Sequence, residues 1–235
     1  MRSPATICYR GLRFGDAVPL TAHQHDALID VFHAPHDPAE GVLGGRRAVK
    51  RLDLAGIGPV VVKQFARGGA IRFFNRQTHI RWGPPRCARE MAWLQRARQL
   101  RIHAPDPVAW ADSGGGLFYR CWLVTRTIPE TLSLAQLGLQ NSERTAAVFP
   151  GVHRQLEILI ENRIHHKDLH PGNILIDNRH DAFFIDFDKA TRHRGDRQSL
   201  AAKYLRRWRR AVAKYGLPPE MNRLMAEALS RRWRL

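Results

Sequence analysis

The chain has 235 residues, with 38 Lys or Arg against 21 Asp or Glu, so its formal net charge is +17. This length allows one domain or two small ones, and 44% hydrophobic residues argue against wholesale disorder. The charge predicts a polyanionic partner, which leaves nucleic acid, an anionic membrane surface and phosphorylated substrates open. Three scattered Cys residues exclude a disulfide scaffold and fit a reducing compartment.

The N-terminal region, residues 1–40, shows little pattern. It contains His25, His33 and His36 among Pro and Asp, and we interpret these residues as loop residues and not as metal ligands. No stretch of the chain reaches the roughly 18 consecutive apolar residues of a spanning helix, and no signal peptide is read. We therefore expect a cytoplasmic protein that is soluble or peripheral to a membrane.

The next predicted elements are two strands and a helix. A β-branched run at 60–62 ends in Lys63 and predicts a strand. Apolar residues at helical spacing predict a helix over residues 86–101, and its start is favoured by two preceding Pro residues. The segment 122–124 is typical of a buried strand that follows a glycine turn.

The second half is predicted to be helical apart from a small hairpin. Helical patterns run from about 132 to 163 and from about 196 onward, where the sequence is strongly basic. Between them lie two short apolar strands, 174–176 and 183–185, joined by a polar turn. This order predicts an α+β protein with a β-rich N-terminal lobe and a small helical C-terminal lobe, over residues 1–125 and 126–235.

The most informative segment runs from His166 to Asn173 and reads His-Lys-Asp-Leu-His-Pro-Gly-Asn. Asp168 lies five positions before Asn173, and Asp186 follows the second hairpin strand thirteen positions after Asn173. This spacing is typical of a kinase catalytic loop and its metal-binding Asp. We predict that Asp168 is the catalytic base and that Asn173 and Asp186 hold Mg²⁺, because Mg²⁺ prefers hard oxygen donors.

Each of these residues also has an ordinary structural interpretation. A loop Asp can cap a turn, a loop Asn can adopt left-handed backbone geometry, and an Asp is common at a strand end. Their combination in this order favours phosphoryl transfer. We expect His166 to pack and hydrogen-bond within the loop, and a metal site built from His165, His166 and His170 is the weaker alternative.

A phosphate-anchoring Lys is expected in the N-terminal half. Only six of the 38 cations are Lys, so Lys63 at a strand end indicates a requirement for a compact charge. Glu90 is the only acidic residue between Lys63 and Asp106, and we predict that it pairs with Lys63. Gly44 and Gly45 belong either to a phosphate-covering loop or to an ordinary hairpin turn, since the segment does not match the kinase glycine-loop pattern.

The catalytic loop resembles that of small-molecule kinases with protein-kinase-like folds. The finer resemblance is to the lipopolysaccharide core kinases, in particular those that act on 3-deoxy-D-manno-octulosonic acid (Kdo) in Gram-negative bacteria. It covers roughly residues 40–210. Four features carry it: the segment from Lys63 through Arg-Gly-Gly at 67–69, Asn-Arg at 75–76 through Trp82, the helix with Arg-Glu at 89–90 that leads to Pro105, and Asp-Phe-Asp-Lys at 186–189.

The resemblance implies ATP and Mg²⁺ as cofactors and phosphorylation of a Kdo hydroxyl, at the 4-position, on a Kdo-linked lipid A precursor. It places this work at the cytoplasmic face of the inner membrane. The resemblance implies the same roles as the spacing: Asp168 as the catalytic base, and Asn173 and Asp186 as the Mg²⁺ ligands. It also implies that Lys63 and Glu90 form the phosphate-anchoring pair. The chain departs from the protein-kinase pattern at its irregular glycine loop and at residue 167, where Lys replaces Arg. Asp188 is either a second metal ligand or a salt-bridge partner.

The positive charge divides into two regions. Residues 64–105 hold nine Arg and one Glu, a local charge of +8. Because guanidinium groups bind carboxylates and phosphates bidentately, we expect this region to bind the anionic glycolipid through Arg67, Arg72, Arg76 and Arg81. The cluster at 203–210, repeated at 231–234, is either an interfacial helix on anionic lipid or an ordinary helix whose Trp faces the core.

Other functions remain as alternatives. A heptose kinase or an aminoglycoside-type phosphotransferase would share the same catalytic loop. A protein kinase is disfavoured, because only 49 residues follow Asp186 and no Ala-Pro-Glu element is present. A nucleic-acid-binding module would explain the charge but not the catalytic loop, and a pseudokinase scaffold is disfavoured by the complete residue set. The Arg content alone also fits a GC-rich genome with a solvated surface. We expect no nucleic-acid partner and no obligate protein partner.

Overall fold

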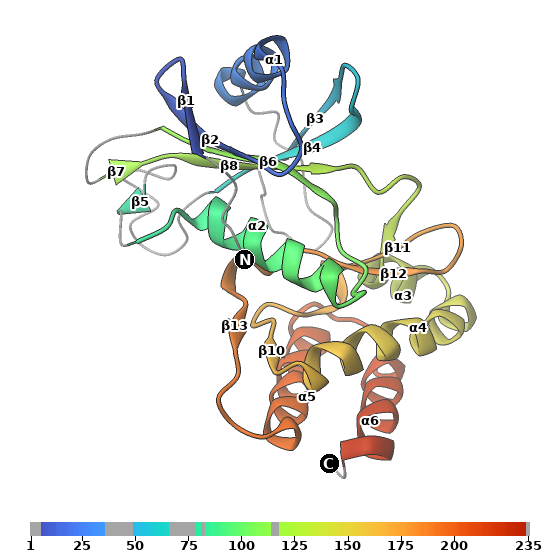
Figure 1. The fold of residues 1–235 in the computed structure, drawn as a ribbon. Coiled ribbons are helices and arrows are strands. Elements are labelled where there is room, and N and C mark those ends of the chain that lie inside the picture. Colours follow the sequence, from blue (N-terminus) through green and yellow to red (C-terminus); the bar gives the residue numbers. More distant parts are fainter. Residues whose placement is uncertain (1–5, 36–48, 66–78, 81–82, 114–117, 234–235) are drawn as a thin grey trace. The chain divides into compact units, whose positions relative to one another are not determined.

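The computed structural model describes residues 6–35, 49–65, 79–80, 83–113 and 118–233. The chain forms two compact units, and each contains two segments of sequence. Unit 1 comprises residues 1–95 and 106–127, and unit 2 comprises residues 96–105 and 128–235. An antiparallel sheet dominates the first unit and helices dominate the second, which confirms the predicted α+β class (Figure 1).

Unit 1 is built on a six-stranded antiparallel sheet with the strand order β1-β2-β6-β8-β4-β3 (Figure 1). A separate short pair joins β5 (His79–Ile80) to β7 (Phe118–Tyr119). The predicted strands at 60–63 and 122–124 lie next to each other in this sheet, as β4 and β8. The six strands are β1 (Thr6–Tyr9), β2 (Leu12–Asp16), β3 (Val49–Leu54), β4 (Gly58–Gln64), β6 (Pro107–Asp112) and β8 (Cys121–Arg126).

Two helices cover the two faces of this sheet (Figure 1). On one face, α1 (Ala22–His33) buries apolar residues against the strands, and the ring of Phe32 stacks on that of Trp122 with their centroids 4.7 Å apart. On the other face lies α2 (Arg86–Gln99), where the buried Cys87 donates from its Sγ to the carbonyl of Ala111 over 3.5 Å. The sheet is therefore held from both sides.

The N-terminal helix corrects one expectation. His25 and His33 lie in α1 and not in a loop, while His36 lies outside the described residues. The helix begins with a capping box in which Thr21 and Gln24 exchange hydrogen bonds, a signal hidden by the surrounding His and Pro residues. His25 is buried and its Nε2 lies 3.0 Å from Asp16 Oδ2.

Unit 2 consists of four helices and short strands. A three-stranded sheet has the order β12-β11-β9, and β10 pairs with β13. The hairpin of β11 and β12 agrees with the sequence prediction. The helices are α3 (Leu134–Gln140), α4 (Ser142–Glu161), α5 (Arg197–Lys214) and α6 (Glu220–Trp233). The strands are β9 (Leu132–Ser133), β10 (Ile164–His165), β11 (Ile174–Ile176), β12 (Ala182–Phe184) and β13 (Thr191–Arg192).

Helix α5 directs its aromatic residues into the core of unit 2. Trp208 is 1% exposed, donates from Nε1 to the carbonyl of Met221 over 3.0 Å, and meets the ring of Phe149 edge to face. Of the two interpretations of this basic cluster, the structure supports the helix whose Trp faces the core. In the parts of the chain that the structure describes, no helix is long and apolar enough to cross a membrane.

Loss of the buried indole should destabilise the protein strongly. We expect Trp208→Ala to lower the free energy of unfolding by about 3–5 kcal/mol, because it removes a large apolar side chain from a packed interior. Trp208→Phe should cost about 1–3 kcal/mol, because the Met221 carbonyl loses its donor. Arg209→Ala is the control at an exposed position of the same helix, expected within about 0.5 kcal/mol of wild type. Urea unfolding measures all three, and a Trp208→Ala variant as stable as wild type would place the indole outside the core.

Candidate active site

The predicted pair of Lys63 and Glu90 lies together in unit 1. Lys63 is in β4 and Glu90 is in α2, and Lys63 Nζ lies 2.6 Å from Glu90 Oε2. Glu90 is buried, whereas 20% of the Lys63 side chain is exposed. The Lys63 ammonium also lies 4.7 Å from the centroid of the Phe65 ring. A buried carboxylate thus fixes the position of an ammonium group that keeps access to solvent.

The loop that follows β10 in unit 2 is held by His166. The imidazole is fully buried, and this burial lowers its pKa, so it is neutral at pH 7. Its Nε2 lies 3.0 Å from the carbonyl of Ile185, and since a carbonyl only accepts, we assign the proton to Nε2. The ring also meets Phe187 edge to face, at 4.6 Å between centroids. His166 therefore joins the beginning of the loop to the residues around Asp186.

Tyr204 fixes the same loop from α5. Its hydroxyl accepts from the backbone N–H of His166 over 2.9 Å and donates to the carbonyl of Ile164 over 2.7 Å. The residue is buried, and burial raises the pKa of the phenol, so the hydroxyl keeps its proton. One side chain of α5 thus satisfies two backbone groups of the loop.

Asn173 joins the two ends of the catalytic segment. It ends the short 3-10 helix η2 (Pro171–Asn173) and is 1% exposed. Its side-chain Nδ2 donates to the backbone carbonyl of Asp168 over 2.8 Å. Its backbone carbonyl accepts from the backbone N–H of Ile185 over 3.0 Å. Because Nδ2 is used in this bond, Oδ1 is the amide atom that could ligate a metal ion. The bond to Ile185 brings Asp186, the next residue, close to Asn173.

Asp186 adopts a left-handed backbone conformation, with φ 67° and ψ 61°, just before the 3-10 helix η3 (Phe187–Lys189). Asp is one of the few residue types other than Gly that tolerate this region, and it forms a tight turn here. Together, Asp186 and Asn173 Oδ1 offer hard oxygen donors, which suit Mg²⁺. Among the described residues, no group of three or more His, Cys, Asp or Glu could hold a metal ion.

Two cations that sequence reasoning left without a role contact Asp168. Lys189 Nζ lies 2.8 Å from Asp168 Oδ2, and Arg207 Nη2 lies 3.7 Å from Asp168 Oδ1. Partial burial raises the pKa of the Asp168 carboxyl, but the hydrogen bond and charge of Lys189 outweigh it, so its pKa lies below the ordinary value. The carboxylate is therefore ionised at pH 7. The sequence signals for Lys189 were the rarity of Lys and its place in the Asp-Phe-Asp-Lys segment at 186–189.

The remaining predicted site residues cannot be placed. The two glycines and the four arginines proposed for phosphate and substrate binding lie outside the described residues; they are Gly44, Gly45, Arg67, Arg72, Arg76 and Arg81. The backbone carbonyl of Lys167, which stands where protein kinases have Arg, accepts from Arg207 Nε over 3.3 Å.

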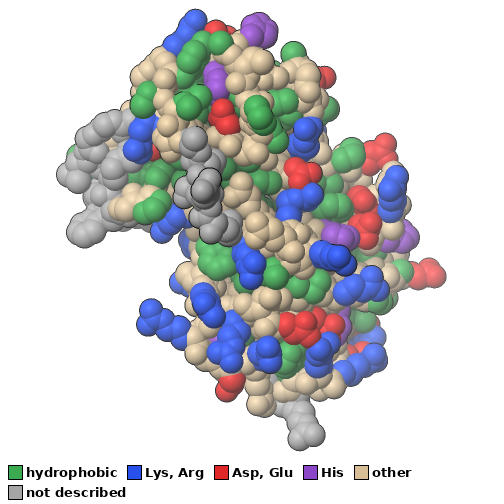
Figure 2. All heavy atoms as spheres, viewed as in Figure 1, with side chains coloured by type: hydrophobic (Ala, Val, Ile, Leu, Met, Phe, Trp, Pro, Cys, Tyr) green, Lys and Arg blue, Asp and Glu red, His purple; other side chains and the backbone are tan. Residues whose placement is uncertain are grey.

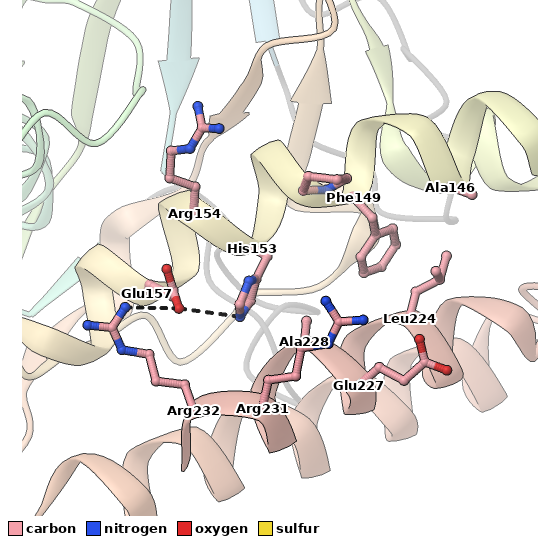
Figure 3. A pocket seen from close by; sticks show the side chains of 11 residues that line it. Ala146, Phe149, His153, Arg154, Glu157, Leu224, Glu227, Ala228, Arg231 and Arg232 are labelled. Atoms are coloured by element: carbon pink, nitrogen blue, oxygen red, sulfur yellow. Dashed lines mark hydrogen bonds and ion pairs between the residues drawn. The ribbon is translucent and has the colours of Figure 1, made fainter. Parts of the chain in front are cut away.

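A separate pocket of about 510 Å³ lies between α4 and α6 (Figure 3). None of the predicted site residues lines it. Its two carboxylates are already paired: Arg232 binds Glu157 over 3.1 Å, and Arg223 binds Glu227 over 2.5 Å. Figure 3 shows His153 pointing from α4 toward α6, and its Nε2 lies 3.8 Å from Glu157 Oε1. Of these three pairs, the one between Arg232 and Glu157 joins α6 to α4, whereas the other two each lie within one helix.

Removal of the Tyr204 hydroxyl should loosen the catalytic loop. We expect Tyr204→Phe to lower the free energy of unfolding by about 1–3 kcal/mol, because two buried backbone groups lose their partner. The measurement is urea unfolding, with hydrogen exchange at the His166 amide as a local readout. Tyr215→Phe is the matched control, since that hydroxyl has no hydrogen-bond partner among the described residues. Equal stability and equal exchange in the two variants would contradict the anchoring role.

Comparison with known proteins gives consistent relationships. The family model described as "Lipopolysaccharide kinase (Kdo/WaaP) family" matches residues 43–226. Three similar curated proteins, each named 3-deoxy-D-manno-octulosonic acid kinase, come from Photobacterium profundum, Vibrio cholerae serotype O1 and Xylella fastidiosa.

The first is 30% identical over 158 residues and the match covers 66% of each chain. The second is 28% identical over 138 residues, or 58% of each chain. The third is 28% identical over 149 residues, or 62% of this chain and 58% of the relative. The matches thus span less than two thirds of the length of these relatives. The family model covers more than half of this chain, including every predicted site residue, and on that basis the protein belongs to the lipopolysaccharide kinase (Kdo/WaaP) family.

Proposed function

We propose that this protein transfers the γ-phosphoryl group of ATP to a hydroxyl of Kdo, at the 4-position, on a Kdo-linked lipid A precursor. The observation that carries the proposal is the catalytic segment of unit 2. There, Asn173 bonds to the Asp168 carbonyl and to the Ile185 amide, so that one short network holds Asp168, Asn173 and Asp186 in order. The names of the relatives support Kdo as the acceptor.

In the proposed reaction, the Asp168 carboxylate orients the acceptor hydroxyl and accepts its proton. The hydroxyl oxygen forms a bond to the γ-phosphorus while the bond from that phosphorus to the β–γ bridging oxygen breaks, and ADP leaves. Asn173 and Asp186 would hold Mg²⁺, which when bound neutralises charge on the nucleotide phosphates. The low pKa of Asp168 keeps the base ionised at neutral pH.

Lys63 and Glu90 are proposed to anchor the nucleotide phosphates. The buried Glu90 carboxylate holds the Lys63 ammonium over 2.6 Å, and an oriented point charge is what phosphate oxygens require. Gly44 and Gly45 are proposed to cover the phosphates, since glycine lets backbone N–H groups approach them closely.

We also propose that the protein works as a peripheral protein at the cytoplasmic face of the inner membrane. Figure 2 shows more Lys and Arg than Asp and Glu side chains on the visible face of the helical unit. On α5, three Arg side chains are exposed and have no carboxylate partner among the described residues: Arg206, Arg209 and Arg210. Such cations are attracted to anionic lipid headgroups.

The reaction itself is tested by mass spectrometry of a Kdo-lipid acceptor after incubation with ATP and Mg²⁺. We expect wild type to add the mass of one phosphate, and Asp168→Asn to slow this by about 10²–10⁴-fold, because the variant lacks the general base. Asp30→Asn makes the same chemical change at an exposed position and should match wild type.

A wild-type rate in Asp168→Asn would remove Asp168 as the base. If no Kdo acceptor gains mass, the Kdo assignment is wrong, and a panel of heptose and aminoglycoside acceptors then tests the alternative kinases.

Glycolipid binding by the Arg-rich region gives a second test. The Arg72→Ala/Arg76→Ala double variant should lose turnover of the glycolipid while ATP binding survives, because two forked donors for carboxylate or phosphate are removed. The control is the Arg51→Ala/Arg179→Ala double variant, which removes the same charge at two exposed positions. Steady-state kinetics and nucleotide titration measure both effects. Unchanged glycolipid turnover in the Arg72→Ala/Arg76→Ala variant would reject the role of this region.

A further inference from the structure

The carboxylate of Asp168 is held by cations from two different elements. Lys189 comes from η3 and contacts Oδ2, and Arg207 comes from α5 and approaches Oδ1. The Lys189 side chain is 59% exposed, against 25% for Arg207 and 28% for Asp168. The contact with Lys189 is therefore open to solvent, at the residue proposed to receive the proton of the acceptor.

Lys189 and Arg207 together have more positive charge and more hydrogen-bond donors than the single carboxylate of Asp168 can pair with. A Lys ammonium has three donors and a guanidinium has five, and only a few of these are used here. Arg207 donates from Nε to the backbone carbonyl of Lys167, and this bond fixes the position of the guanidinium group. Asp186 also acts on Asp168 electrostatically, but its own charge is assigned to Mg²⁺ in the proposed reaction. A positive charge with free donors thus remains beside the base.

An acceptor hydroxyl must compete with these contacts to reach Asp168. A neutral sugar that displaced Lys189 would leave the ammonium without an anion. A sugar with its own carboxylate would supply the replacing anion in the same exchange, so the cost of separating Lys189 from Asp168 is compensated. The arrangement therefore favours acidic acceptors over neutral ones.

We infer that Lys189 and Arg207 form the binding site for the carboxylate of an acidic acceptor sugar, immediately beside Asp168. The inference rests on the proposed function and deepens it, since it names the residues that select the substrate. Arg207 is the fixed member, held by the Lys167 carbonyl, and Lys189 is the exposed member that changes partner. When Lys189 exchanges Asp168 for the carboxylate of the acceptor, Asp168 Oδ2 becomes free to receive the hydroxyl proton.

Direct binding of free Kdo and of its methyl ester tests this inference without any turnover. Calorimetric titration of wild type should show Kdo binding about tenfold more tightly than the ester, the effect of one charge-assisted hydrogen bond. Lys189→Met and Arg207→Gln should lose this preference, whereas Lys189→Arg should retain part of it. Arg194→Gln is the control, because it removes an exposed charge of the same unit at a residue with no assigned role, and it should keep the full preference.

Kinetics distinguish the acceptor from the nucleotide. In Lys189→Met the KM for the glycolipid should rise while the KM for ATP stays unchanged. A rise in the KM for ATP alone would assign the cations to nucleotide phosphate and overturn the inference. Equal binding of Kdo and its ester to wild type would overturn it as well, and this comparison needs no variant to fold.

The two proposals fail in different ways. Binding that prefers the free carboxylate without phosphorylation of any Kdo acceptor would sink the proposed reaction and support the site. Phosphorylation of Kdo with no preference for the free carboxylate would support the proposed reaction and overturn the carboxylate site.

Discussion

The catalytic segment depends on the hydrogen bonds of one residue, His166, whose imidazole is buried and neutral. His166 donates from Nε2 to the carbonyl of Ile185, and its backbone N–H donates to Tyr204. Protonation of this ring would place a charge in the interior, and this cost is the reason that burial lowers the pKa of His166. One residue, through its side chain and its backbone N–H, therefore connects the strand end before Asp168, the residue before Asp186 and helix α5.

The division of labour between Lys and Arg follows their geometry. Lys50 donates from one ammonium group to two carbonyls near the end of α1, Val31 at 2.6 Å and Ala34 at 2.5 Å. Arg13 instead forms two parallel bonds to the buried carboxylate of Asp112, at 3.0 Å and 2.5 Å, across the paired strands β2 and β6. The planar pair in the sheet thus uses Arg and the double contact at the end of α1 uses Lys, although Arg207 also donates singly to a carbonyl, that of Lys167.

The sequence predicts the local structure of the segment from His166 to Asp186 well, because the spacing that indicates it is local. The spacing of Asp168, Asn173 and Asp186 already specifies a loop followed by a hairpin, and the structure has both. Lys63 and Glu90 were matched by elimination, since a single acidic residue was available across a long stretch.

Other features depend on tertiary contacts that no local pattern contains. Arg207 lies on a helix with several neighbouring Arg residues, and only the burial of Tyr204 and Trp208 decides which of them faces Asp168. Helix α1 was missed because its capping box is formed by Thr21 and Gln24, ordinary residues in a segment rich in His and Asp. In both cases packing determines the outcome.

The scarcity of lysine has a consequence for chemical labelling. Reagents that acylate primary amines can react with only six side chains in this protein, and the 32 Arg residues stay unmodified. One of the six, Lys189, is largely exposed and contacts Asp168, and another, Lys63, is partly exposed and paired with Glu90. Amine acylation therefore includes one proposed acceptor residue and one proposed nucleotide residue among a few sites, with the exposed Lys167 and Lys214 as internal references, and the order in which these amines are protected reports which ligand is bound.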